Sequence, residues 1–148
     1  MTDKPKAKAK AKPKAPEQKN YFSEKELRCR HSHEYKFDDD FLKLLNSMRD
    51  DCGFAFPITS GYRSETHPIE ARKIQRGRVA GCHNTGKAVD IAVKGAKAQK
   101  VIESAVKHGI TRIGVQQKGN NRFIHIDACK QSDFPDSENF PECAIWSY

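Results

Sequence analysis

The chain has 148 residues and a formal net charge of +8, with 27 lysine and arginine residues against 19 aspartate and glutamate residues. This length suffices for one domain whose hydrophobic core can fold without disulfides or a metal. No apolar run approaches the length of a membrane span and no apolar segment of a secretory signal follows the first methionine, so we expect synthesis in the cytoplasm without a signal peptide.

Residues 1–20 are rich in lysine, alanine and proline and carry much of the positive charge. From Lys4 to Lys14, lysine alternates with alanine or proline, so the segment has no apolar face to bury. We therefore predict a disordered basic arm. Such an arm could bind an anionic cell-wall polymer or nucleic acid, or could serve only to keep the protein in solution. We assign residues 21–148 to one folded domain and expect a monomer.

Three helices are expected in this domain. Ser23 and Glu26 have the spacing of a capping box for a short helix over 24–28. A second helix is expected over 38–52, where apolar residues recur with helical periodicity at Phe41, Leu44, Leu45 and Met48. A third is expected over 95–108, closed by a glycine in the usual C-terminal position.

Four segments read as strands: 54–60, 88–93, 112–116 and 122–128. The polar stretch 64–82 reads mostly as loop with one helical turn, and the last twenty residues read as irregular. We therefore predict an α+β fold, with a small antiparallel sheet, helices packed on its aliphatic face and a metal site on the other.

Strand alternation separates the polar residues of two strands from their aliphatic neighbours. Asp90 faces away from Val89 and Ile91, and His125 shares its face with Asp127 but not with the flanking isoleucines. His83 precedes the first of these strands, and Gly86 allows the chain to turn so that all the polar side chains can converge.

His83, Asp90 and His125 offer two imidazole nitrogens and one carboxylate oxygen. Three such ligands leave the fourth position of a tetrahedral zinc ion open, which is the arrangement of hydrolytic zinc sites. Singly, each residue has an ordinary alternative as a surface aspartate or a hydrogen-bonded core histidine. The zinc hypothesis depends on whether the three side chains meet.

The five cysteines are odd in number and irregularly spaced: Cys29, Cys52, Cys82, Cys129 and Cys143. This pattern is typical of free thiols in a reducing compartment. A disulfide formed after export is the alternative.

Three separated motifs occur in a recognisable order: Ser60-Gly-Tyr-Arg63, His83-x-x-Gly86-x-Ala88-x-Asp90 and His125-x-Asp127. Together they resemble the zinc peptidases of bacterial cell walls. These include D-alanyl-D-alanine carboxypeptidases and dipeptidases and phage L-alanyl-D-glutamate endopeptidases, whose fold hedgehog signalling domains share. The resemblance covers roughly residues 21–148.

The resemblance implies one Zn²⁺ per chain, held by His83, Asp90 and His125 with water in the fourth position. It also implies that Arg63 stabilises the oxyanion of the tetrahedral intermediate, although a structural arginine paired with a carboxylate is the alternative. The implied substrates are the stem peptides of peptidoglycan. Carboxypeptidase and endopeptidase action both stay open.

Two departures from the family pattern bear on catalysis. Gly81 stands where many members have serine, and Arg122 stands where several branches have a catalytic carboxylate. The general base is therefore open. We favour Asp127, which lies on the ligand face beside His125, as the catalytic base that activates the water. The alternative is that Asp127 only orients a ligand histidine, and Glu65 and Glu70 are reserve candidates for the base.

The sequence thus predicts a zinc metallopeptidase acting on peptidoglycan. A small protein without a signal peptide but with a basic arm suits a phage endolysin, which reaches the wall through a holin, or a virion-associated lysin. One alternative is a catalytically inactive zinc-binding module of the same fold that binds cell wall or a protein. A second is a basic nucleic-acid-binding protein.

Overall fold

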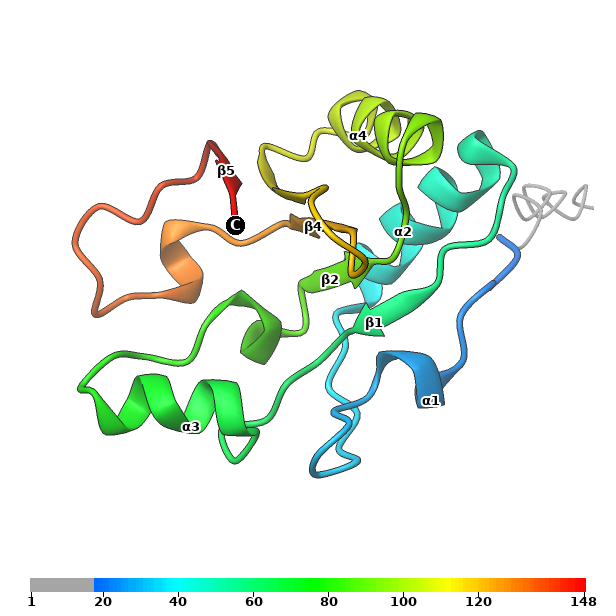
Figure 1. The fold of residues 1–148 in the computed structure, drawn as a ribbon. Helices are drawn as coiled ribbons and strands as arrows, with labels where there is room; N and C mark the ends of the chain where they lie inside the picture. Colours follow the sequence, from blue (N-terminus) through cyan, green and yellow to red (C-terminus); the bar gives the residue numbers. More distant parts are fainter. Residues whose placement is uncertain (1–17) are drawn as a thin grey trace, which may run out of the picture.

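A five-stranded sheet in the order β1-β2-β4-β3-β5 runs through the computed structural model, which describes residues 18–148 (Figure 1). The predicted basic arm, residues 1–20, lies almost wholly outside the described residues. The α-helices and strands are α1 (Glu24–Leu27), α2 (Asp39–Cys52), β1 (Ile58–Ser60), α3 (Pro68–Gln75), β2 (Ala88–Ile91), α4 (Ala96–Lys107), β3 (Arg112–Gln116), β4 (Phe123–Asp127) and β5 (Ala144–Ser147). Two 3₁₀ turns are η1 (Cys82–Thr85) and η2 (Gln131–Asp133).

The predicted α+β class is confirmed, and the pairings β1–β2, β2–β4 and β3–β4 are antiparallel as expected. The expectation that the last twenty residues are irregular was wrong for residues 144–147, which form β5. This strand runs parallel to β3, so the sheet is mixed and not purely antiparallel as predicted. After β4 the chain makes a long excursion through residues 128–143 and returns beside the start of β3, where the amide of Ala144 donates to Thr111 O at 2.9 Å. A strand of four residues after such an excursion has no local signal strong enough to set its direction.

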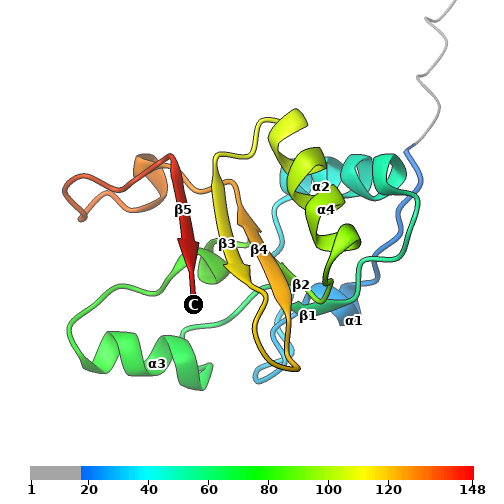
Figure 2. The same cartoon turned by 45° about the horizontal axis from the view of Figure 1, so that its top comes forward.

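Helices α2 and α4 lie side by side on one side of the sheet (Figures 1 and 2). Asp38 caps α2 by accepting from the amide of Phe41, and Gly53 ends the helix in the left-handed conformation at φ 71°. The core contains side chains from both helices and from the three central strands: Phe41, Leu45, Met48, Val89, Ile91, Ala98, Val101, Ala105, Ile113, Ile124 and Ile126. Across residues 18–148, no helix combines the length and hydrophobicity needed to cross a bilayer.

Helix α3 is longer than the single turn expected from the sequence. Pro68 occupies its first turn, and the His67 ring accepts a hydrogen bond from the amide of Ile69 at 3.2 Å. Its apolar residues Ile69 and Ile74 are both exposed, so the helix buries no apolar face. A helix without a buried apolar face lacks the periodic apolar residues by which a helix is predicted from sequence. In Figure 2 it lies apart from α2 and α4, on the other side of the sheet.

The face of the sheet opposite the helices carries one continuous row of cross-strand neighbours. Ser60 pairs with Asp90, Asp90 with His125, His125 with Gly114, and Gly114 with Trp146. The indole of Trp146 covers Gly114, and a Cβ at this position would lie 2.7 Å from the ring. The indole can therefore take this place only because residue 114 has no side chain. The indole in turn lies 5.3 Å from the His125 ring, measured between centroids.

Replacing Gly114 with alanine should therefore lower the free energy of unfolding by about 1–3 kcal/mol, because the added methyl group displaces the Trp146 ring. Urea unfolding of the two proteins measures the difference. In a Trp146→Ala background the same replacement should cost much less, since the obstructing ring is gone. Equal costs in both backgrounds would contradict this interpretation of Gly114.

Candidate metal centre

The three predicted metal ligands do come together. One donor atom from each of His83, Asp90 and His125 lies within 4.8 Å of the others. All three residues are buried, with 5–7% of their surface exposed. The Nε2 atom of His83 lies 3.4 Å from Asp90 Oδ1, and the Nδ1 atom of His125 lies 2.9 Å from the same oxygen.

His83 is positioned by the 3₁₀ turn η1 and by the glycine that ends it. Gly86 has a φ of 76°, and a Cβ at this position would lie 2.1 Å from Lys36 O. The Nδ1 atom of His83 donates to Gly61 O at 2.7 Å, which directs Nε2 toward Asp90. One ring nitrogen is thus used for positioning, and the other faces the cluster.

His125 is oriented in the same way by a carboxylate. Its Nε2 atom donates to Asp127 Oδ2 at 2.7 Å, which leaves Nδ1 toward Asp90. The second oxygen of Asp127 accepts from Arg112 Nε at 2.7 Å and from the amide of Cys129 at 3.1 Å. The Asp127 side chain has no exposed surface, so both of its oxygens face partners within the protein.

The pKa values of the metal-free cluster reflect this close packing. Burial alone would lower the pKa of His125, but its hydrogen bonds to Asp127 and Asp90 prevail and raise it to about 9. Burial would raise the pKa of Asp90, but hydrogen bonds from His125 and His83 hold it well below its usual range. A metal cation would replace the shared proton as the positive charge between the donors.

The donor chemistry fits zinc. Two imidazole nitrogens and one carboxylate oxygen, with each imidazole oriented by a second hydrogen bond, are typical of zinc sites with an open position. The ring contacts to Gly61 O and Asp127 leave one nitrogen of each histidine free to bind the ion.

Arg63 lies beside the cluster. Its Nε donates to Ser60 Oγ at 2.9 Å and one Nη donates to Asp90 Oδ2 at 3.4 Å, while the other Nη lies 3.7 Å from a carboxylate oxygen of Glu70. The backbone fixes the same segment, because the Arg63 amide donates to His83 O at 3.0 Å. The guanidinium is therefore held next to the candidate metal ligands.

Neither of the other candidate bases points a free carboxylate at the cluster. Glu70 is fully buried, with one oxygen accepting from the amide of Gly81 at 2.7 Å and both oxygens near Lys73 Nζ. Glu65 lines a separate cavity with Asn84 and Asp136. Glu70 instead holds Arg63 and the segment that leads into His83.

The family model described as Peptidase M15 matches residues 20–127. This region spans most of the chain and contains Arg63, Asp127 and the three candidate ligands. The chain belongs to the peptidase M15 family. A search of curated proteins gives no significant match.

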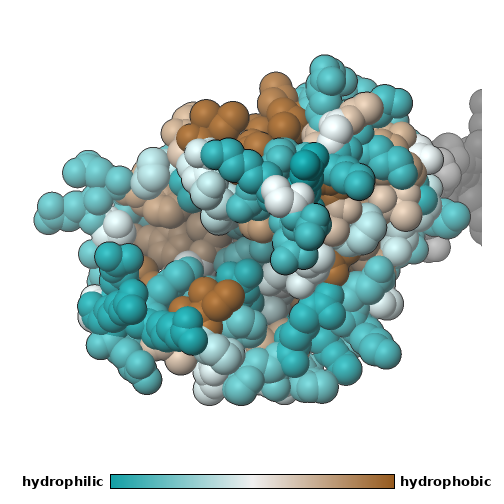
Figure 3. Space-filling view, viewed as in Figure 1, coloured by the Kyte–Doolittle hydropathy of each residue, from teal (hydrophilic) through white to brown (hydrophobic). Residues whose placement is uncertain are grey.

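In this M15 peptidase a cavity of about 560 Å³ opens over the cluster. Figure 3 shows a recess on this side of the molecule, between the polar surface over α3 and the C-terminal segment. Its lining combines the ligands with cationic and aromatic side chains, including Arg63, Lys73, Arg112, Phe123, Trp146 and Tyr148. Arg63, Lys73 and Arg112 make part of the cavity wall positively charged.

Sequence reasoning missed several of these lining residues. Arg112 lies within the strand expected over 112–116, and Trp146 lies in the last twenty residues, which read as irregular. Their place in the cavity depends on strand register, because Arg112 pairs with Asp127 and Trp146 pairs with Gly114. The alternation of side chains between the two faces of β3 offered a local signal, because it puts Arg112 on the same face as Gly114.

Proposed function

We propose that this M15 peptidase is a zinc metallopeptidase that hydrolyses amide bonds in the stem peptides of peptidoglycan. The observation that carries the proposal is the convergence of His83, Asp90 and His125 at the floor of an open cavity. The family match supports peptidase chemistry, and the donor set supports zinc, one ion per chain.

The three candidate ligands and Arg63 then have distinct roles in the proposed hydrolysis. Zinc, when bound, supplies a Lewis acid that polarises the substrate carbonyl and activates water. His83, Asp90 and His125 hold the ion, and Arg63 donates to the carbonyl oxygen of the scissile amide as negative charge develops there. Phe123, Trp146 and Tyr148 contribute apolar surface on which a peptide can lie.

We infer that Asp127 acts mainly by orienting His125, rather than as the general base. Its carboxylate is fully buried, and its two oxygens already accept from His125 Nε2 and Arg112 Nε. A base must accept a proton from a water in the cavity. Asp127 borders the cavity, but both of its oxygens already accept hydrogen bonds from protein donors. Arg112 completes the chain of contacts by fixing the carboxylate.

Replacing Asp127 with asparagine should weaken zinc binding by about 10–100-fold. The amide keeps an oxygen for Arg112 but places an N–H₂ group opposite the Nε2 proton of His125, so the ring loses its preferred orientation. Competition with a chromophoric chelator measures the Kd for zinc, and steady-state kinetics measure kcat.

The matched control for this experiment is Asp133→Asn, which removes a carboxylate that pairs with Lys87 at 2.9 Å outside the cluster. That variant should bind zinc as the parent protein does. If Asp127→Asn kept the parent Kd for zinc but lost kcat, Asp127 would be the general base after all.

Metal removal tests the proposed function itself. Dialysis against a chelator should abolish the release of new amino groups from purified peptidoglycan, and stoichiometric zinc should restore it. A release that persists in demonstrably metal-free protein would contradict a zinc peptidase. Full-length protein is used, so that any contribution of residues 1–17 to wall binding is retained.

A catalytically inactive zinc-binding module is the second candidate, and one observation favours it. Asp90 and Asp127 supply the only carboxylates among the described residues that line the cavity, and both are engaged. Arg122, at the position of the family carboxylate, donates to Gly119 O at 2.9 Å and lines a different cavity. Zinc binding without any amide cleavage would favour this alternative.

The biological setting belongs to the proposal as well. We propose action on the bacterial wall as a phage endolysin or virion-associated lysin, by a monomer whose basic arm binds an anionic wall polymer. Deleting residues 1–19 should then weaken activity on whole walls but leave activity on a soluble stem peptide unchanged. Loss of nucleic-acid binding as the main effect would favour a basic nucleic-acid-binding protein instead.

A further inference from the structure

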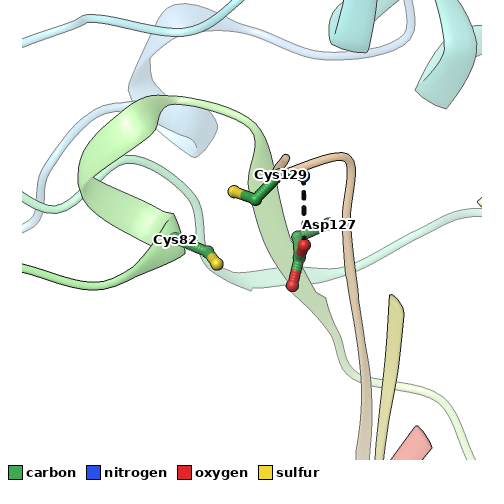
Figure 4. A group of neighbouring side chains, drawn as sticks. All are labelled: Cys82, Asp127 and Cys129. Atoms are coloured by element: carbon green, nitrogen blue, oxygen red, sulfur yellow. Dashed lines mark hydrogen bonds between the residues drawn. The ribbon is translucent and has the colours of Figure 1, made fainter. Parts of the chain in front are cut away.

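A second group of side chains lies directly beside the metal cluster, and its two cysteines have no role in the proposed reaction. It consists of Cys82, Asp127 and Cys129, with one sulfur or oxygen atom of each within 4.8 Å of the others. Cys82 begins η1 and precedes the ligand His83, whereas Cys129 follows the end of β4. Figure 4 shows both sulfur atoms directed into the space between these two elements.

The two thiols differ in accessibility. Cys82 is partly exposed and lines the cavity, so a small reagent can reach its sulfur from solvent. Cys129 is buried, with 3% of its surface exposed, and its sulfur lies 3.4 Å from Thr85 Oγ1. A reagent that reacts at Cys82 would therefore bring the modified sulfur next to a second, protected thiol.

The surroundings favour sulfur chemistry over a second metal ion. The Asp127 carboxylate already accepts from Arg112 and His125, so it has little capacity left to bind a cation. The Arg112 guanidinium lies 3.9 Å from Cys82 Sγ and would repel a metal ion placed there. The same guanidinium stabilises negative charge on the Cys82 sulfur during thiol–disulfide exchange.

We propose that Cys82 and Cys129 are a reversible modification site, in which the two thiols form an intramolecular disulfide when the protein meets a small-molecule disulfide such as oxidised glutathione. The Cys82 thiolate attacks one sulfur of the oxidant, forms a mixed disulfide and releases one glutathione thiolate. Cys129 then attacks Cys82 Sγ and releases the second. Two protein thiols are oxidised and one glutathione disulfide is reduced to two thiols.

The disulfide would join η1 to the segment after β4 without dismantling the metal cluster. His83 is held independently through Gly61 O, and His125 through Asp127. The link closes a loop of 48 residues, from Cys82 to Cys129. By restricting the unfolded chain it should stabilise the domain against unfolding. This inference does not depend on the proposed function, because the thiol pair exists whether or not the cavity cleaves a peptide.

The test is oxidation of full-length, zinc-loaded protein with oxidised glutathione, followed by alkylation of the remaining thiols and tryptic mass spectrometry. Trypsin would release Cys82 within residues 79–87 and Cys129 within residues 123–130, since each peptide lies between basic residues. The expected product is these two peptides joined, with a mass about 2 Da below their sum. Dithiothreitol should separate them.

Thermal unfolding provides the second readout, with Cys143→Ser as the matched control because Cys143 is exposed and lies outside the pair. Oxidation should raise the Tm by roughly 5–10 °C in the parent and in Cys143→Ser, but not in Cys82→Ser or Cys129→Ser.

Two results would overturn the proposal. One is the absence of the disulfide after oxidation, either because all five thiols stay free or because glutathione stays attached to Cys82 and Cys129 never displaces it. The other is a second zinc ion per chain that is lost in Cys129→Ser, which would identify the group as a metal site.

Discussion

Replacing His125 with alanine is expected to remove bound zinc and to lower stem-peptide hydrolysis by at least about 10³-fold. His125 contributes a donor atom 2.9 Å from Asp90 Oδ1 and also the contact to Asp127, so its loss leaves two metal donors and one buried oxygen of Asp127 without its partner. Zinc per chain after dialysis, measured by elemental analysis, and the rate of amide cleavage give the two readouts.

His108→Ala is the matched control, because His108 pairs with Asp51 at 2.6 Å and is not among the residues that line the cavity. This variant should retain one zinc ion and the parent rate. If His125→Ala kept both zinc and activity, the metal centre assigned to His83, Asp90 and His125 would be wrong. Circular dichroism of each variant separates a loss of metal from a loss of folding.

Replacing Arg63 with alanine should lower kcat by about 10²–10³-fold while zinc stays bound. The guanidinium lies beside the cluster, 3.4 Å from Asp90 Oδ2, where it can donate to an oxyanion. The fold should survive, because the buried Glu70 carboxylate keeps its contacts with Lys73 and the amide of Gly81. Arg63→Lys should recover only part of kcat, since an ammonium group lacks the planar fork of donors.

Arg122→Ala is the corresponding arginine control, because Arg122 lines a different cavity from Arg63. Its kcat should match that of the parent. An Arg63→Ala variant with unchanged kcat would show that Arg63 is a structural residue paired with Asp90 and Glu70. That result would leave the zinc site intact but remove oxyanion stabilisation from the mechanism.

Much of the site was predictable because it depends on local patterns. Alternation within β2 and β4 places Asp90 and His125 opposite the buried aliphatic side chains, and the structure confirms both faces. The turn at Gly86 depends on a residue type with an obvious backbone consequence. The two long helices were predictable for the same reason, since each carries a regular apolar stripe.

The remaining parts depend on contacts between distant segments. The partner of Asp127 is Arg112, which is set by the β3–β4 register and by no motif. The sequence could place Asp127 on the ligand face, but it could not reveal that a guanidinium already occupies its second oxygen. Trp146 reaches His125 only because β5 returns parallel to β3 beside a glycine that leaves room for the indole.

The most direct test is mass spectrometry of the soluble products released from purified peptidoglycan by the zinc-loaded protein, beside His125→Ala. We predict new stem-peptide fragments that the variant does not produce, and their masses would identify the scissile amide bond. Unchanged peptidoglycan from several wall types, with one zinc ion confirmed per chain, would contradict the peptidase assignment and favour a zinc-binding module without catalytic activity.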